Sequence, residues 1–363
     1  MAGAWTQSTG SEGGVLVLGR YSYEVYMGAE KIATEMVAVK PGESVVVTAD
    51  TESDPSVVNA VAGAILAHGG KPLVMVNPAP SEVAKAGEHA LPVEVLAAAL
   101  SHADAWVELN NKWLLYSTVW EAATKTGRVR HLCLVGMNAD MLVRTVARVD
   151  NLTLRAFMNA VADLTRRASV VRITTPAGTD VTFRNRPDQP VIVESGDASV
   201  PGSHYLTGQV FWAPRLDTVE GTIVFDGSLV PPLGKVQTPV RLEVREGVIR
   251  DISGGQDAAA FRSWLEGFGN ENMFRMAHIC YGFNPGAKLV GEVLEDERVW
   301  GCTEWGIGYM SAEDVPPDGI PAPAHCDGIC LNSSVWLDGV QVLDQGKVVH
   351  PDLVPLAQRL GKA

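Results

Sequence analysis

Residues 44–76 read SVVVTADTESDPSVVNAVAGAILAHGGKPLVMV, and this stretch decides the fold. Its first five residues, 44–48, are a β-branched run typical of a strand. The Asp-Pro pair at 54–55 then supplies an N-cap and a first-turn proline for a helix whose apolar positions share one face. A Gly-Gly pair at 69–70 ends that helix, and residues 72–76 form the next apolar run. Strand, helix and strand in this order predict a βαβ unit with parallel strands.

A second unit of the same kind follows. Residues 105–109 read as a strand, a helix is expected to open at Thr118 with Glu121 three residues later as a capping box, and residues 131–135 read as another strand. Repeated βαβ units imply a parallel sheet flanked by helices. No G-x-G-x-x-G follows the first strand, so the sequence gives little support for a dinucleotide site.

The pattern changes after a helical stretch at 152–167. Several short strand pairs separated by turn residues are typical of antiparallel hairpins, and they lie at 170–174 with 180–183, 240–244 with 248–252, and 334–337 with 340–343. We therefore expect an α/β domain over residues 1–168 and an α+β domain over residues 169–363.

Composition narrows the class of partner. A chain of 363 residues exceeds a single ordinary core, which agrees with two domains. Its net charge of −13 argues against nucleic acid and anionic membranes, because both select for basic patches. No apolar run approaches the roughly 20 residues of a membrane span, so we expect a cytoplasmic protein that acts on a small molecule or another protein. Five cysteines without framework spacing are expected to be free thiols.

Four side chains able to bind a metal lie in the last quarter of the chain: His278, Glu304, His325 and Asp327. On an extended strand His325 and Asp327, two residues apart, would project to the same face. Two imidazoles and one carboxylate leave coordination positions open, which suits Fe(II) that activates oxygen or Zn(II) that activates water. Glu304 sits among glycines and apolar residues, where a carboxylate without a partner or a metal would be costly to bury. The acidic run at 292–298 reads mainly as a solvated loop.

Several motifs resemble those of the 2,5-dihydroxypyridine 5,6-dioxygenase family, which shares its fold with the M29 aminopeptidases. They are Glu-Gly-Thr-Ile-Val-Phe at 220–225, Ile-Ser-Gly-Gly at 252–255, Ala-His-Ile-Cys-Tyr-Gly-Phe-Asn-Pro at 277–285, Pro-Ala-His-Cys-Asp at 323–327 and Trp-Leu-Asp-Gly at 336–339. The likeness covers most of residues 170–350 and only loosely the N-terminal half. It implies an M29 aminopeptidase-like fold, with an N-terminal α/β domain and a C-terminal domain that holds the metal.

The resemblance also implies roles for individual residues. His278, His325 and Asp327 fall where the dioxygenases bind Fe(II), and His204 resembles a histidine of their substrate pocket. Glu194 is a looser match for a substrate-binding position. The aromatic candidates for stacking on a substrate ring, each of which could equally be a core residue, are Trp212, Tyr281, Phe283 and Trp305.

Two positions depart from the related patterns. Gln209 stands where the aminopeptidases carry a metal-binding glutamate, which weakens a two-metal peptidase site because a neutral amide is a poor bridge between two cations. Glu304 stands where the dioxygenases have a serine and the peptidases a histidine. It could therefore be an extra ligand or a general base.

Three functions remain open from the sequence. The first is a mononuclear non-haem Fe(II) dioxygenase that opens a small hydroxylated aromatic or N-heteroaromatic ring with O2, with His204 or Glu304 accepting the substrate proton. The second is a hydrolase that uses Zn, Mn or Co, with Glu304 as base or extra ligand. The third is a small-molecule-binding protein with a degenerate metal site. The resemblance also implies a homo-oligomer, because enzymes of this group assemble as dimers or larger rings.

Overall fold

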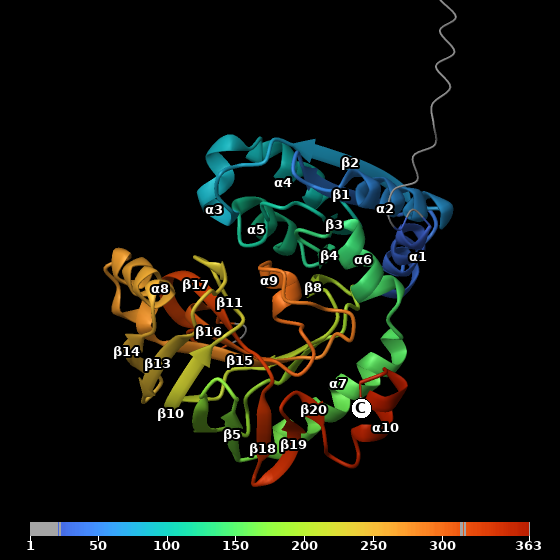
Figure 1. The fold of residues 1–363 in the computed structure, drawn as a ribbon. Coiled ribbons are helices and arrows are strands. Elements are labelled where there is room, and N and C mark those ends of the chain that lie inside the picture. Colours follow the sequence, from blue (N-terminus) through green and yellow to red (C-terminus); the bar gives the residue numbers. More distant parts are fainter. Residues whose placement is uncertain (1–20, 22, 313–314, 316, 363) are drawn as a thin grey trace, which may run out of the picture.

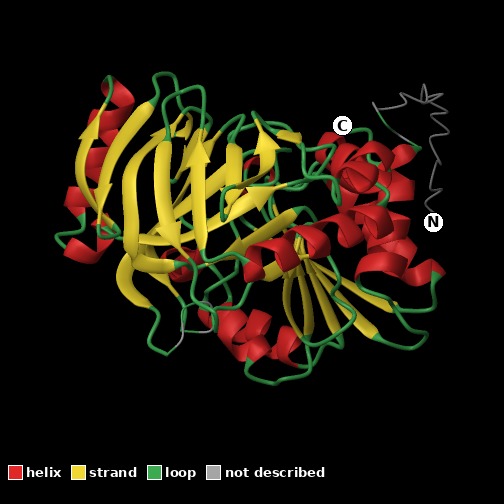
Figure 2. Ribbon diagram, turned by 90° about the horizontal axis from the view of Figure 1, so that it is seen from below, coloured by secondary structure: helices red, strands yellow, loops and turns green. Residues whose placement is uncertain are grey.

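Three β-sheets form most of the molecule (Figure 1). The computed structural model describes residue 21, residues 23–312, residue 315 and residues 317–362. One sheet is parallel and flanked by helices, and the other two lie together in the second part of the chain (Figure 2). Within the described residues, no helix has the length and apolarity needed to cross a membrane.

The parallel sheet has the strand order β2-β1-β3-β4-β8, and all four of its strand pairs are parallel. Its strands are β1 (Ser44–Asp50), β2 (Lys71–Asn77), β3 (Ala105–Glu108), β4 (Arg130–Cys133) and β8 (Gly202–Tyr205). The four strands expected from the sequence are all present, so the predicted βαβ units and the α/β class are confirmed.

Helices cover both faces of this sheet because consecutive strand residues, which point to opposite faces, are apolar. Val45 and Val47 pack against α1, α2 and α6, whereas Val46 and Trp106 pack against α4 and α5. The helices of this part are α1 (Glu24–Lys31), α2 (Pro55–Ala67), α3 (Ala84–Gly87), α4 (Val93–Ser101), α5 (Thr118–Thr124) and α6 (Ala139–Leu142), which continues into a π-helical turn at Val143–Ala147.

One of two predicted helix caps is confirmed. The Asp54 carboxylate accepts the backbone N–H of Ser56 at the start of α2. In α5 the N-cap is Ser117, whose hydroxyl accepts the N–H of Trp120, and not Thr118. Thr118 is instead held by Glu88, which accepts both its N–H and its hydroxyl, so a partner distant in sequence moves the cap by one residue.

The two parts of the chain exchange elements. Helix α7 (Asn151–Arg167) packs through Leu154, Phe157 and Met158 into the core of the second part, although the sequence groups it with the first. Strand β8 returns from the second part to the parallel sheet, beside β4. We therefore propose that the division lies at the start of α7 and not near residue 168.

The second part contains an eight-stranded and a seven-stranded sheet. The first has the order β14-β13-β10-β6-β5-β18-β19-β20, and its strands are β5 (Val170–Thr174), β6 (Asp180–Arg184), β10 (Arg215–Phe225), β13 (Val240–Arg245), β14 (Val248–Ser253), β18 (Ser334–Leu337), β19 (Val340–Asp344) and β20 (Lys347–Val348). The three predicted hairpins are confirmed as β5–β6, β13–β14 and β18–β19.

The seven-stranded sheet carries the candidate site and has the order β12-β11-β17-β16-β15-β9-β7. Its strands are β7 (Ile192–Glu194), β9 (Gln209–Trp212), β11 (Ser228–Val230), β12 (Gly234–Lys235), β15 (Met276–Gly282), β16 (Thr303–Met310) and β17 (Ile320–Cys330). The remaining helices are α8 (Gln256–Gly267), α9 (Val293–Asp296) and α10 (Val354–Arg359).

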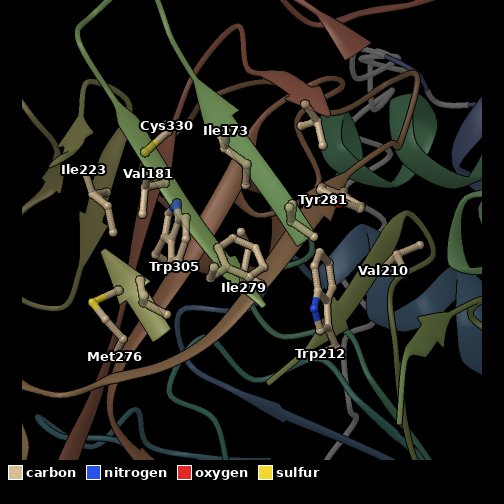
Figure 3. Close-up of a cluster of buried hydrophobic side chains, with 14 of the residues drawn as sticks. Ile173, Val181, Val210, Trp212, Ile223, Met276, Ile279, Tyr281, Trp305 and Cys330 are labelled. Carbon is tan, nitrogen blue, oxygen red and sulfur yellow. The ribbon is translucent and has the colours of Figure 1, made fainter. Parts of the chain in front are cut away.

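The large core lies between these two sheets. Ile173, Val181 and Ile223 of the eight-stranded sheet meet Ile279 and Trp305 of the seven-stranded sheet (Figure 3). Helix α7 closes one side of this core. All five cysteines are free and buried, as expected.

Candidate metal centre

Three adjacent strands bring the polar residues together on one face of the seven-stranded sheet. His278 of β15 lies opposite Gly306 of β16, and Gly306 lies opposite Asp327 of β17. Directly opposed residues of antiparallel strands share a face, and so do residues two apart on one strand. Glu304 and His325 therefore lie on this same face, as the spacing of His325 and Asp327 predicts.

The glycine in the middle of this row makes room for the histidine. A Cβ atom on Gly306 would lie 2.2 Å from Nδ1 of His278, so the imidazole rests directly against the glycine backbone. Any side chain at position 306 would displace this ring.

The polar atoms of the four side chains converge. Nε2 of His278 lies 3.0 Å from Oε2 of Glu304 and 3.7 Å from Oδ1 of Asp327. Nε2 of His325 lies 2.8 Å from the same Asp327 oxygen. The two imidazole rings are parallel to within 14°, with centroids 5.2 Å apart.

The hydrogen bonds of His325 indicate a cation at this point. Nδ1 lies 2.7 Å from the carbonyl oxygen of Tyr309, which can only accept, so Nδ1 must carry a proton. In a neutral ring Nε2 then holds a lone pair that faces the Asp327 carboxylate. A lone pair and a carboxylate repel each other, and a proton or a metal ion between Nε2 and Asp327 removes this repulsion. A histidine that binds a metal commonly donates its other ring N–H to a backbone carbonyl, as His325 does here.

Burial and charge shift the pKa values of these groups. Burial, followed by the negative charge of Asp327, raises the pKa of Glu304 well above its usual range. Burial alone would raise the pKa of Asp327, but the charge and hydrogen bond of His325 hold it below its usual value. Burial opposes protonation of His325, yet Asp327 raises the pKa of this imidazole overall. The site thus concentrates negative charge that a cation would offset.

A divalent metal fits three of the four side chains. His278, His325 and Asp327 each offer a ligand atom, and these atoms all lie within 4.8 Å of one another. Glu304 touches His278 but does not join this set. It is fully buried, and its Oε1 has no hydrogen-bond partner among the described residues. Such a buried acceptor points to a ligand or substrate group at this position.

A second layer lies on the same face beside His278, His325 and Asp327, the candidate triad. Gln209 donates from its amide nitrogen to Cys280 Sγ at 3.1 Å and to Oε2 of Glu297 at 3.0 Å. Arg298 binds the same Glu297 oxygen at 3.1 Å. Burial, together with the charge of Asp327, raises the pKa of Glu297 to about 8 despite Arg298. Gln209 thus acts as a hydrogen-bond donor inside the protein.

The aromatic candidates lie elsewhere. Trp212, Tyr281 and Trp305 point into the core on the opposite face of the sheet, where the view shows them among aliphatic side chains (Figure 3). Phe283 packs edge-on against Phe157, with centroids 5.0 Å apart. The structure does not bring any of these four rings to the candidate triad.

An aromatic ring that the sequence analysis did not select does reach the triad. Phe211 is partly exposed and meets His278 edge-on at a centroid distance of 5.9 Å. Its position directly before Trp212 gives the signal that was missed, because neighbouring strand residues alternate between faces.

The two remaining candidates occupy different sheets. Glu194 is opposite Gln209 at the edge strand β7, so it shares the face of the triad and is buried. His204 lies on β8 of the parallel sheet, where Nε2 contacts the carbonyl oxygen of Val200 at 3.0 Å. Burial lowers the pKa of His204. Only Glu194 thus belongs to the sheet of the triad.

The acidic run at 292–298 is not a solvated loop, contrary to expectation. Glu295 and Asp296 are fully buried on α9. Glu295 binds the guanidinium of Arg144 and the N–H of Lys288, and Asp296 accepts the N–H groups of Val290 and Gly291. These partners satisfy the carboxylates and allow their burial.

A second group of metal-capable side chains lies in the parallel sheet: Glu108, His131 and Cys133. Its histidine is already bonded on both nitrogens, to Ser203 Oγ at 3.1 Å and to Glu108 Oε2 at 3.0 Å. The other Glu108 oxygen accepts the N–H of Leu114. Burial raises the pKa of the Cys133 thiol well above its usual value. This group is a satisfied polar network that joins β3, β4 and β8.

Comparison with known proteins gives consistent results. A family model described as 2,5-dihydroxypyridine 5,6-dioxygenase (NicX) matches residues 29–306. The 2,5-dihydroxypyridine 5,6-dioxygenase of Pseudomonas putida KT2440 is 28% identical over 265 residues, which cover 70% of this chain and 73% of that protein.

Two solved structures share the fold. That of 2,5-dihydroxypyridine dioxygenase from Pseudomonas putida KT2440 superposes with a TM-score of 0.75 at 24% identity, over 92% of this chain and 99% of that chain. AmpT from Thermus thermophilus, an M29 aminopeptidase, superposes with a TM-score of 0.65 at 15% identity, over 91% and 100% of the two chains. The predicted M29 aminopeptidase-like fold is therefore confirmed.

Proposed function

The chain belongs to the 2,5-dihydroxypyridine 5,6-dioxygenase family, and from this membership we propose that it is a metal-dependent dioxygenase that cleaves the ring of a small hydroxylated aromatic compound. A dihydroxypyridine-like N-heteroaromatic is the first substrate to test. Within the structure, the observation that best supports this proposal is the convergence of His278, His325 and Asp327 on one face of the sheet. The hydrolase and the non-catalytic binding protein are not favoured, because the matched family is one of dioxygenases.

We propose that these three residues hold Fe(II). Two histidines and one carboxylate on one side of the ion are the set used by non-haem iron oxygenases, and they leave positions open. When bound, the iron would supply the one-electron chemistry that lets O2 react with a closed-shell aromatic ring. The carbonyl of Tyr309 fixes the ring of His325, so that Nε2 points towards Asp327.

We assign Glu304 as the group that accepts the substrate hydroxyl proton. Its Oε2 touches His278, and its unpartnered Oε1 is free to take a proton from a neighbouring ligand. His204 is the weaker candidate, because it lies on the parallel sheet. Phe211 would shield the triad from water at the ring of His278.

The oxygen requirement tests this function. Purified protein loaded with Fe(II) should consume O2 and 2,5-dihydroxypyridine in equal amounts and show no turnover under strict anaerobiosis. Anaerobic turnover would exclude an oxygenase. Metal analysis gives an independent answer, since one iron per chain supports the proposal and two zinc-like ions per chain contradict it.

A further inference from the structure

A basic cavity lies away from the metal centre, where the first part of the chain meets α7, α10 and the loop after β15. Its volume is about 590 Å³. Five cationic residues and one acid line it, together with small and apolar residues: Arg144, Arg148, Lys288, Arg359, Lys362 and Asp150.

Two of the five cations are neutralised within the protein. Arg144 binds Asp140 and Glu295, and Arg148 reaches Glu24 at 3.2 Å. Both arginines therefore orient the wall of the cavity more than they add unbalanced charge to it.

The other three cations have no carboxylate within ion-pair distance among the described residues. Arg359 donates to the hydroxyl of Thr153 at 2.8 Å. The ammonium of Lys362 lies 5.9 Å from the centre of the Trp300 ring. Lys288 is exposed at the mouth of the cavity. Burial lowers the pKa of Lys362.

The one acid of the cavity is already engaged. Asp150 caps α7, accepting the N–H of Thr153 at 3.1 Å and its hydroxyl at 2.6 Å. The positive charge of Arg359 adds to the lowering of the pKa of Asp150, so the two side chains are close, yet the Arg359 guanidinium donates its hydrogen bond to the hydroxyl of Thr153. Among the described residues that line the cavity, Arg359, Lys362 and Lys288 are thus accompanied by one carboxylate that is not already paired with an arginine of the wall, that of Asp150.

We propose that this cavity binds a small, multiply charged oxyanion of the phosphate or dicarboxylate class. Arginine and lysine side chains bind such groups through charge-assisted hydrogen bonds, and a volume of about 590 Å³ can hold a small metabolite. The proposal goes beyond the proposed function and does not depend on it.

The cavity is also connected to the metal centre. The loop Pro285, Gly286, Ala287 and Lys288 of its lining follows β15, which carries His278. Arg144 of the cavity binds Glu295, two residues before Glu297 of the metal centre. An anion that draws Arg144 from Glu295 would act on this segment, so binding should alter turnover as well as stability.

Calorimetric titration with inorganic phosphate, and separately with malonate, tests the site at constant ionic strength set with chloride. The site variant is Arg359→Gln/Lys362→Gln. The matched control is Lys125→Gln/Lys347→Gln, which removes the same charge at two exposed positions that form no ion pair among the described residues. We expect saturable binding by the wild type and the control, and at least tenfold weaker binding by the site variant. The anion that binds more tightly, phosphate or malonate, identifies the class of ligand that the cavity prefers.

Three results would overturn the proposal: no saturable binding of either anion by the wild type, equal binding by the site variant, or equal weakening in both variants. Circular dichroism establishes that the site variant is folded. If it is not, the single variant Lys288→Gln takes its place, with an expected threefold or greater loss of affinity, and unchanged affinity there would equally reject the site.

Discussion

At the scale of single residues, Gly306 makes room for the ring of His278 in the candidate triad of His278, His325 and Asp327. The ring of His278 lies where a Cβ atom at position 306 would be, at 2.2 Å from Nδ1. No rotamer change at position 306 avoids this contact, because the Cβ position is set by the backbone.

The variant Gly306→Ala should therefore lose metal. We expect at least tenfold lower iron occupancy after dialysis against limiting Fe(II), because the displaced imidazole no longer points Nε2 at Asp327. Gly63→Ala is the matched control, since Gly63 lies in α2 with open space around its Cβ position and should bind iron normally. Full iron occupancy in Gly306→Ala would show that the ring can move without consequence.

Iron content and turnover should distinguish the roles of Glu304 and His278. Glu304→Gln preserves shape but removes the proton acceptor, so we expect iron content to stay near one per chain while turnover falls by about 100-fold, within the usual range for a lost general base. His278→Ala should lose the iron itself. If Glu304→Gln also loses iron, Glu304 is a ligand and not a base.

The sequence predicted which residues of one strand share a face, but not which residues of neighbouring strands lie beside them. The two-residue spacing of His325 and Asp327 places both on one face of any strand, so this pair could be predicted without knowing the strand's neighbours. The pairing of His278 with Gly306 depends on the register between two strands, which the sequence does not display. Trp305 directly follows Glu304, and neighbouring residues of a strand point to opposite faces, so its ring lies in the core and not at the candidate site.

At the scale of elements, the seven-stranded sheet separates a polar face from an apolar one. Trp305 is 1% exposed and fills the core directly behind Glu304 and Gly306. Trp305→Ala should lower the free energy of unfolding by about 3–5 kcal/mol, because it removes a large buried ring. Phe211→Ala, on the other face and partly exposed, should cost less. Urea denaturation measures both, and equal losses would contradict this division of the sheet.

Helix α9 shows that charge composition alone does not predict burial. The run at 292–298 has the composition of a solvated loop, but a distant arginine, Arg144, provides the partner that permits burial of Glu295. Glu295→Gln should destabilise the fold by about 3–5 kcal/mol, since it leaves a buried guanidinium with a weaker partner. Glu292→Gln, at an exposed position of the same segment, should stay within about 0.5 kcal/mol. Similar midpoints in thermal denaturation for the two variants would contradict the burial.

At the scale of the whole molecule, the sequence predicted the class of each part from local patterns. The βαβ units and the hairpins follow from local patterns of apolar residues and turns, which is why they were predicted correctly. The membership of β8 and α7 depends on contacts between segments far apart in the chain.

A fragment ending at residue 168 should therefore fail to fold alone. It would lack β8 and would expose Leu154, Phe157 and Met158 of α7, which pack into the other part. We expect poor amide dispersion in its NMR spectrum and rapid proteolysis, in contrast to the full chain. A well-dispersed spectrum of the fragment would show that the parallel sheet is complete without β8.

The return of β8 has a consequence for how the protein is made. A ribosome delivers residues 44–133 of the parallel sheet long before Gly202–Tyr205 emerges, so β4 must wait with an open edge while about 70 further residues are added, for several seconds at ordinary rates of synthesis. During this interval His131 lacks Ser203 as a partner. The nascent chain is thus most exposed to aggregation in mid-translation, and codon choice or a chaperone acting between these two points should govern how much of it is recovered folded.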